Sequence, residues 1–298
     1  MDIAVNVPAL IVLGVAVGLV AGMFGVGGGF LLTPLLSVVL RVPLPIAVGT
    51  GLCQIIGTAT VALLRHKKLG QGELRVDVLM IAGSLIGVSA GARTVSALEH
   101  AGSVAIAGGS IPLVNLVLYG LFAVLLAASS WIFWRQGRKL SDALDEARPG
   151  PLARLRFGPS IDLPRVPMRG VSAVGIAYLG VVLGFVSGLL GIGGGVVLLP
   201  VLIYGFGFPV RQAAGTGILA LLVTAAVGTV EHALAEHVHL GMACVLLIGS
   251  TLSAQLGALL TRRLAAHTLR RTFAVLLWIT IAAIVWDVAR RLAFVHGA

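Results

Sequence analysis

The sequence predicts an all-α protein that crosses a lipid bilayer many times. Of the 298 residues, 58% are hydrophobic and only 11% are charged, and the mean hydropathy is +1.06. A water-soluble domain carries about 25% charged residues, so this composition excludes a soluble globular protein. A helix crosses the hydrocarbon core with roughly 20 apolar residues. Segments of about that length without charges run over 8–26, 44–64, 78–92, 111–134, 170–192, 212–230, 240–261 and 272–286.

Two further apolar segments, 30–40 and 196–208, are too short to cross the bilayer unaided. Each follows three consecutive glycines and contains a proline, Pro34 or Pro200. We expect both to be short helices that are sheltered inside the protein, because irregular backbone in the membrane is tolerated only where protein or a wet cavity surrounds it.

Charge divides the chain into three parts. Residues 135–169 hold eight basic and four acidic side chains and five prolines, a composition that buries too little apolar surface to order itself independently. We therefore expect an N-terminal transmembrane repeat over 1–134, a basic, proline-rich cytoplasmic linker over 135–169 and a C-terminal transmembrane repeat over 170–298. The first ten residues lack the basic start and cleavage site of a removable signal peptide, so the first hydrophobic segment is expected to stay.

The two hydrophobic parts are copies of one another. With an offset of 166 positions, fifteen of the 34 pairs between residues 18 and 51 are identical. Eleven of the fifteen identities fall on glycine, proline and threonine: GLVAGMFGVGGGFLLTP aligns with GFVSGLLGIGGGVVLLP, and AVGTG with AAGTG. Composition bias would scatter the matches instead, so we interpret the halves as a duplication.

Basic residues predict that the copies face opposite ways. The loop 65–75 carries four Lys or Arg residues and its counterpart 231–241 carries none, whereas 261–271 carries four. Basic short loops tend to stay cytoplasmic. This favours two inverted repeats, each of four long helices plus one short post-glycine helix, with both termini outside. The alternative is a broken first helix, four crossings in each half and parallel repeats.

The glycine triplets are the candidate functional positions. Two broken helices at the interface of inverted repeats are typical of transporter sites, where helix N-termini point at an anion. Helix packing is the alternative for the triplets, and it is the favoured interpretation for Gly18, Gly22, Gly184 and Gly188. The flanked threonines can bind a ligand or cap a helix. The predicted substrate-binding residues are Gly27, Gly28, Gly29, Thr50, Gln54, Gly193, Gly194, Gly195 and Thr216.

Several other activities have no support in the sequence. No charged residue lies deep inside a predicted span; Asp77, Arg93 and Asp287 are near span ends. The histidine-rich loop 231–239 matches no fixed metal-ligand spacing, although a metal site or a pH sensor there stays open as an alternative. Neither glycine triplet leads into the Gly-Lys-Ser/Thr of a nucleotide-binding loop. We expect no catalytic residues, cofactor, metal or nucleic acid.

The doubled motif resembles the sulfite exporter TauE/SafE family of membrane permeases, and the resemblance covers both halves. It implies a multi-pass transporter of the plasma membrane whose substrate is a small sulfur-containing anion such as sulfite or a sulfonate. An alternating-access carrier is the expectation that follows. A channel of the same architecture and a membrane scaffold without transport are the alternatives. A homo-oligomer is compatible with the sequence.

Overall fold

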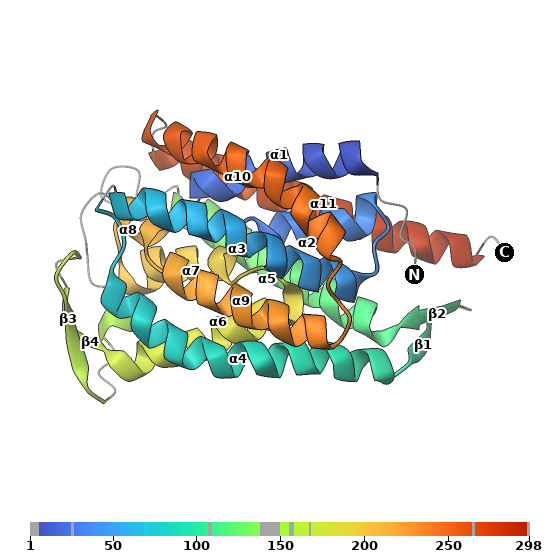
Figure 1. Ribbon diagram of the computed structural model, residues 1–298. Coiled ribbons are helices and arrows are strands. Elements are labelled where there is room, and N and C mark those ends of the chain that lie inside the picture. The colour runs from blue at the N-terminus through green and yellow to red at the C-terminus, as the bar shows by residue number, and fades with distance from the viewer. Residues whose placement is uncertain are drawn as a thin grey trace.

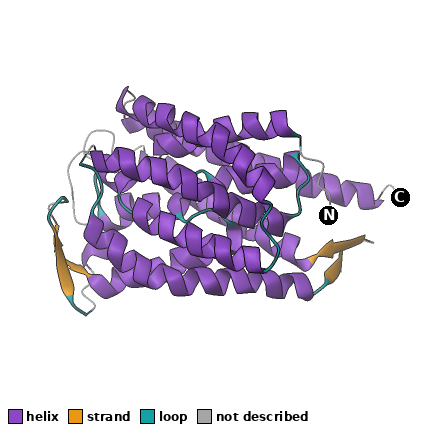
Figure 2. Ribbon diagram, in the orientation of Figure 1, coloured by secondary structure: helices purple, strands orange, loops and turns teal. Residues whose placement is uncertain are grey.

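The chain forms a bundle of long helices with a two-stranded sheet at each end (Figures 1 and 2). The computed structural model describes residues 6–24, 27–68, 70–106, 109–137, 150–154, 158–166, 168–263 and 266–296. Within these residues, seven helices are long and apolar enough to cross a membrane. Three shorter apolar helices accompany them, at Gly29–Val39, Gly195–Phe206 and Arg271–Trp286. The prediction of a polytopic all-α membrane protein is confirmed.

The first half has five helices and one β-hairpin, β1–β2. Its second helix, α2, begins at the last glycine of the triplet, contains Pro34 and is short, as the sequence predicts. The hairpin between α4 and α5 is a feature that the sequence analysis did not anticipate. The elements are α1 (Val7–Phe24), α2 (Gly29–Val39), α3 (Leu44–Lys68), α4 (Leu74–His100), β1 (Ser103–Ile106), β2 (Gly109–Pro112) and α5 (Leu113–Gly137).

The second half repeats this order with two interruptions of its own. The post-glycine helix changes from α-helix to a wider π-helical turn after Pro200, and the third helix is split in two. The elements are α6 (Ala173–Leu190), α7 (Gly195–Pro200), η2 (Val201–Phe206), α8 (Val210–Gly215), α9 (Ile218–Leu234), α10 (Leu240–Arg263) and α11 (Ala266–His296).

The first helix of each half packs against the fourth helix of the other half, α1 on α10 and α6 on α4. Glycines four residues apart make these contacts so close that a Cβ would collide with the facing backbone, as at Gly22 against Ala254 and Gly188 against Val88. Lipid is as apolar as the side chains, so close packing of small residues replaces the hydrophobic effect as the force between membrane helices.

The contacting pairs also give the helix directions. Gly14 and Gly22 meet Leu246 and Ala254 in turn, so α1 runs parallel to α10, and the pairs made by α6 show that it runs parallel to α4. In contrast, Thr50 near the start of α3 bonds to His239 in the turn after α9, and Glu73 in the turn after α3 bonds to Thr216 just before α9. These two helices are therefore antiparallel. The α3–α4 turn and the α9–α10 turn therefore lie at opposite ends of the bundle.

Part of the segment between the halves, which we expect not to order itself independently, is folded against the bundle. It contains the short helix η1 (Leu152–Arg154) and the antiparallel strands β3 (Ser160–Leu163) and β4 (Met168–Ser172). The hairpin is anchored to the α3–α4 turn, because the Arg165 backbone N–H donates to Glu73 Oε2 at 2.9 Å and Arg75 donates to the Asp162 carbonyl. Order thus comes from docking on the bundle. Residues 138–149, 155–157 and 167 of the predicted linker lie outside the described residues.

Candidate functional site

The two glycine triplets meet in the interior of the bundle. A Cβ on Gly27 would lie 3.0 Å from Leu221 and 3.2 Å from Ile55, and a Cβ on Gly193 would contact the same two side chains. Ile55 and Leu221 are themselves 166 positions apart, so equivalent residues of both halves close the centre. The structure therefore brings the predicted triplets together, with two apolar side chains between them.

Each triplet interrupts a helix. Gly28 and Gly194 precede α2 and α7 with φ angles of 75° and 77°, a left-handed conformation that glycine adopts without a Cβ penalty. Gly29 and Gly195 are the first residues of these helices. A further bond ties the two halves here, because the Thr33 hydroxyl donates to the carbonyl of Gly191 at 3.5 Å.

The two motif threonines are engaged in equivalent bonds between the halves. Thr50 Oγ1 accepts the backbone N–H of His239 at 3.0 Å, and Thr216 Oγ1 accepts that of Glu73 at 3.1 Å. Glu73 precedes α4 and His239 precedes α10, where helix N–H groups lack partners within the helix. Both hydroxyls are buried, so each threonine secures the start of a helix in the other half.

Gln54 is the one predicted residue whose polar atoms have no partner in the described part of the chain. Its side chain is fully buried in α3, and neither Oε1 nor Nε2 accepts or donates a hydrogen bond there. Leaving a buried polar group unpaired costs about 1–3 kcal/mol. Gln54 directly precedes Ile55 in α3, the side chain that lies against both triplets.

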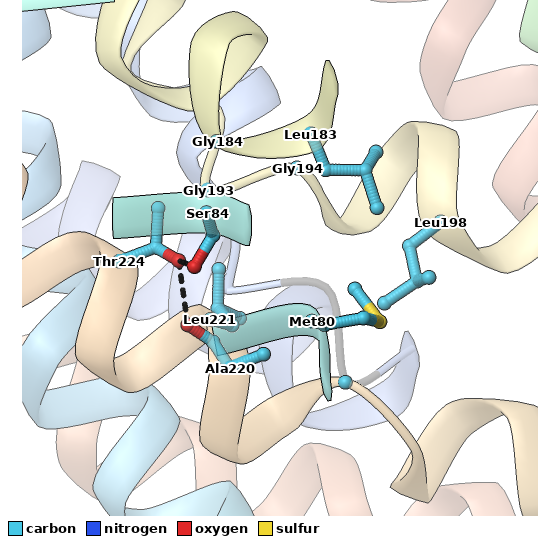
Figure 3. Close-up of a pocket in the computed structure, with 11 residues that line it drawn as sticks. Met80, Ser84, Leu183, Gly184, Gly193, Gly194, Leu198, Ala220, Leu221 and Thr224 are labelled. Carbon is cyan, nitrogen blue, oxygen red and sulfur yellow. Dashed lines mark hydrogen bonds between the residues drawn. The ribbon is translucent and has the colours of Figure 1, made fainter. Parts of the chain in front are cut away.

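A small cavity of about 10 Å³ adjoins the second triplet. Gly193 and Gly194 line it together with residues of α4, α6 and α9. Figure 3 shows the polar side of the cavity, where the Thr224 hydroxyl lies 2.9 Å from that of Ser84 and 2.7 Å from the Ala220 carbonyl. This volume is room for about one water molecule.

A buried carboxylate beside this cavity is a feature that the sequence analysis missed. Asp77 lies in the first turn of α4 and is 4% exposed. Its Oδ1 accepts the Ala220 N–H at 3.4 Å, and the N–H groups of Gly217 and Leu219 also donate to it. The carboxylate thus occupies the N-terminus of α9, where the helix dipole favours negative charge. In the sequence Asp77 is the one charged residue over 76–92, and an acidic residue within an apolar segment of a membrane protein was the available signal.

The histidine-rich loop does not form a metal centre in the described structure. Among the described residues, no group of three or more His, Cys, Asp or Glu side chains is arranged to hold a metal ion. The side chains of His232 and His237 instead hydrogen-bond to one another and to other protein groups.

Comparison with known proteins identifies the family. Residues 10–284 match the family described as sulfite exporter TauE/SafE. The chain is 28% identical to the probable membrane transporter protein YunE of Bacillus subtilis, over 83% of this chain and 85% of that protein. It is 31% identical to the probable membrane transporter protein YjnA of the same organism, over 82% of this chain and 89% of that protein. A probable membrane transporter protein of Methanocaldococcus jannaschii is 26% identical to it, over 76% of this chain and 72% of that protein.

No solved structure gives a significant match. The family match extends from the first spanning helix into the last helix and so includes both glycine triplets. Together with seven apolar helices, it makes the chain a multi-pass protein of the plasma membrane, in a family of transporters rather than of enzymes. The chain belongs to the sulfite exporter TauE/SafE family of membrane transporters.

Proposed function

We propose that the chain carries a small sulfur oxyanion, sulfite or an organosulfonate, across the membrane by alternating access. The substrate lies between the two glycine interruptions, with Gln54 as a hydrogen-bond donor. The unpartnered amide of Gln54 is the observation that carries this assignment, because a buried polar group without a partner calls for a ligand or water that satisfies it.

The closed centre supports a carrier over an open channel. Ile55 and Leu221 fill the space between Gly27 and Gly193, and the adjoining cavity of about 10 Å³ is too small for a sulfur oxyanion. Substrate entry therefore requires these side chains and the helices behind them to move. The bonds made by Thr50 and Thr216 link the halves, so direct contact of these hydroxyls with substrate requires the same movement.

The two halves are inverted repeats in this proposal, and loops 65–75, 135–169 and 261–271 face the cytoplasm. The antiparallel α3 and α9 and the exchanged pairs α1–α10 and α4–α6 support it. Single cysteines at positions 70 and 236, both exposed, test the orientation after Cys53 and Cys244 are replaced by alanine. An impermeant reagent should label position 236 from outside intact cells and position 70 only after lysis. Labelling of both from one side would contradict the inverted arrangement.

Gln54→Leu is the sharpest test of the substrate site. Leucine removes two unsatisfied polar atoms, so the free energy of unfolding should stay constant or rise by about 1–3 kcal/mol. Uptake of radiolabelled sulfite into proteoliposomes should nevertheless fall about tenfold or more, because a hydrogen bond to a charged group contributes about 1.5–3 kcal/mol. Thermal unfolding and initial uptake rates give the two quantities.

Gln255→Leu is the matched control, since Gln255 is an exposed glutamine of α10. Its uptake rate should equal that of the unmodified chain. Full sulfite and sulfonate uptake by Gln54→Leu would exclude Gln54 from the site. A purified chain that moves neither class of anion would contradict the proposed function as a whole.

A further inference from the structure

A chain of buried hydrogen bonds lies at the end of the bundle where α9 turns into α10. His232 Nε2 donates to the carbonyl of Gly188 at 2.8 Å, and its Nδ1 lies 3.3 Å from Nδ1 of His237. His237 Nε2 lies 2.6 Å from Oε2 of Glu99 at the end of α4. His232 is 1% exposed and His237 6%, while Glu99 reaches the surface. This chain of hydrogen bonds therefore runs from solvent into the bundle.

The three bonds of this hydrogen-bond chain need three hydrogens, one more than two neutral imidazoles beside a carboxylate carry. A carbonyl only accepts, so the hydrogen of neutral His232 is on Nε2, and its Nδ1 must accept from His237. The His237 hydrogen is then on Nδ1, and its contact with the Glu99 carboxylate needs a second one. With His232 neutral, all three bonds form together when His237 and Glu99 share one added proton.

The first half lacks this capacity at the equivalent positions. His66 and Gln71 stand 166 positions before His232 and His237, and His66 Nδ1 lies 2.7 Å from Gln71 Oε1. A glutamine amide bonds without taking up a proton. The duplication thus retains the hydrogen bond in both halves and places a titratable partner in one.

Few other charges face the chain of hydrogen bonds. Helices α6 and α3, which contact it, bring no Asp, Glu, Lys or Arg over 173–190 and 44–64. His239 precedes α10, where its Nδ1 accepts the Met242 N–H at 3.2 Å. The remaining ionisable groups on the neighbouring turns of α4 and α9 are Arg93, His100, Glu231 and Glu236.

The chain of hydrogen bonds connects elements that have to move in transport. Gly188 lies on α6 shortly before the second glycine triplet, and its carbonyl is the acceptor at the inner end. Gly49, in the motif of α3, packs against the backbone of His237 and the Cβ of His232. Loss of the proton removes one of three bonds that hold α4, α6 and the α9–α10 turn together, so protonation favours one arrangement of these elements over another.

We propose that His237 and Glu99, with His232 behind them, form a proton-binding site that couples anion transport to a proton gradient. The coupling rests on the proposed transport function, whereas binding of the proton itself does not. The first experiment therefore reads the proton directly, and the second reads its link to flux.

Nitrogen NMR of the full chain in lipid vesicles, with ¹⁵N-labelled histidine, detects imidazole rings that are protonated on both nitrogens. We expect such a signal, and we expect it to disappear in His237→Gln and in Glu99→Gln, since a glutamine at either position completes the chain of hydrogen bonds without the added proton. It should persist in His100→Gln, which alters the exposed neighbour of Glu99. A signal that survives in His237→Gln, or its absence from the unmodified chain, would overturn the proton site.

Sulfite flux into proteoliposomes tests the coupling. An imposed proton gradient should accelerate flux relative to exchange at equal pH on both sides, and His237→Gln should reduce this ratio about tenfold, within the usual range of coupling between two sites. His100→Gln should keep the ratio of the unmodified chain. An unchanged ratio in His237→Gln overturns the coupling alone. Absence of all flux overturns the transport function and the coupling together, while the NMR signal still decides the proton site.

Discussion

The third helix is continuous in the first half and broken in the second, although both halves carry nearly the same motif there. α3 runs unbroken through Gly49-Thr50-Gly51. In the second half α8 ends at Gly215, Thr216 is extended, and Gly217 has a φ of 89° before α9 begins. Two almost identical segments therefore adopt different backbones.

The neighbouring helix explains the difference. Asp77 of α4 accepts the N–H groups that a new helix start leaves free at Gly217, Leu219 and Ala220. The equivalent position in α10 is Ala243, whose side chain has no hydrogen-bond acceptor. The corresponding N–H groups of α3 therefore keep their hydrogen bonds within a continuous helix. A tertiary partner, rather than the local motif, decides whether the helix breaks.

The largest effect is expected where the halves are alike. Gly22→Ala and Gly188→Ala each place a Cβ against a facing backbone carbonyl, of Ala254 and of Val88. Backbone yields less than a side-chain end, so each change should lower the free energy of unfolding by about 3 kcal/mol, the upper range for overpacking. Thermal unfolding in detergent measures both.

Gly120→Ala is the control, because an added Cβ there meets nothing within 4 Å. It should leave stability constant or raise it by about 0.5–1 kcal/mol, the helix preference for alanine. A large loss in one half and none in the other would show that the two interfaces are not equivalent.

An intermediate effect is expected where the halves differ. Asp77→Ala removes the acceptor at the start of α9, which should cost about 2 kcal/mol. Val78→Ala, at the exposed next position, should change stability by less than about 0.5 kcal/mol. Equal melting temperatures for the two variants would mean that the carboxylate does not hold the break.

The smallest effect concerns the bonds between the halves. Thr50→Ala and Thr216→Ala each remove the hydroxyl that accepts a helix-start N–H, so each should lower stability by about 1 kcal/mol. Thr60→Ala, whose exposed hydroxyl donates within its own helix, should cost less. The melting curves of Thr50→Ala and Thr216→Ala are compared with that of Thr60→Ala. A loss of stability in only one of the two variants would contradict the equivalence of the two threonine bonds.

The sequence predicted the features that depend on composition and repetition. Hydropathy located the seven spanning helices of the described residues, whereas the eighth predicted span, 272–286, lies in one of the shorter apolar helices, Arg271–Trp286. The 166-position offset pointed to the two triplets that the structure brings together around Ile55 and Leu221. Asp77 was set aside because it lies near the end of a predicted span. Its partner, Ala220, is 143 positions away, so only the fold reveals their contact. The β1–β2 hairpin went unrecognised although paired glycines between short apolar runs are a hairpin signal.

The packing of each first helix against the fourth helix of the other half has a consequence for biosynthesis. α1 is made first, but the helix that it packs against, α10, begins only at Leu240. At synthesis rates of about 5–20 residues per second, α1 waits in the bilayer for roughly ten to forty seconds with its glycine face uncovered. Neither half can complete its packing when it is expressed separately, whereas two co-expressed fragments divided within 138–149 retain every interhelical contact.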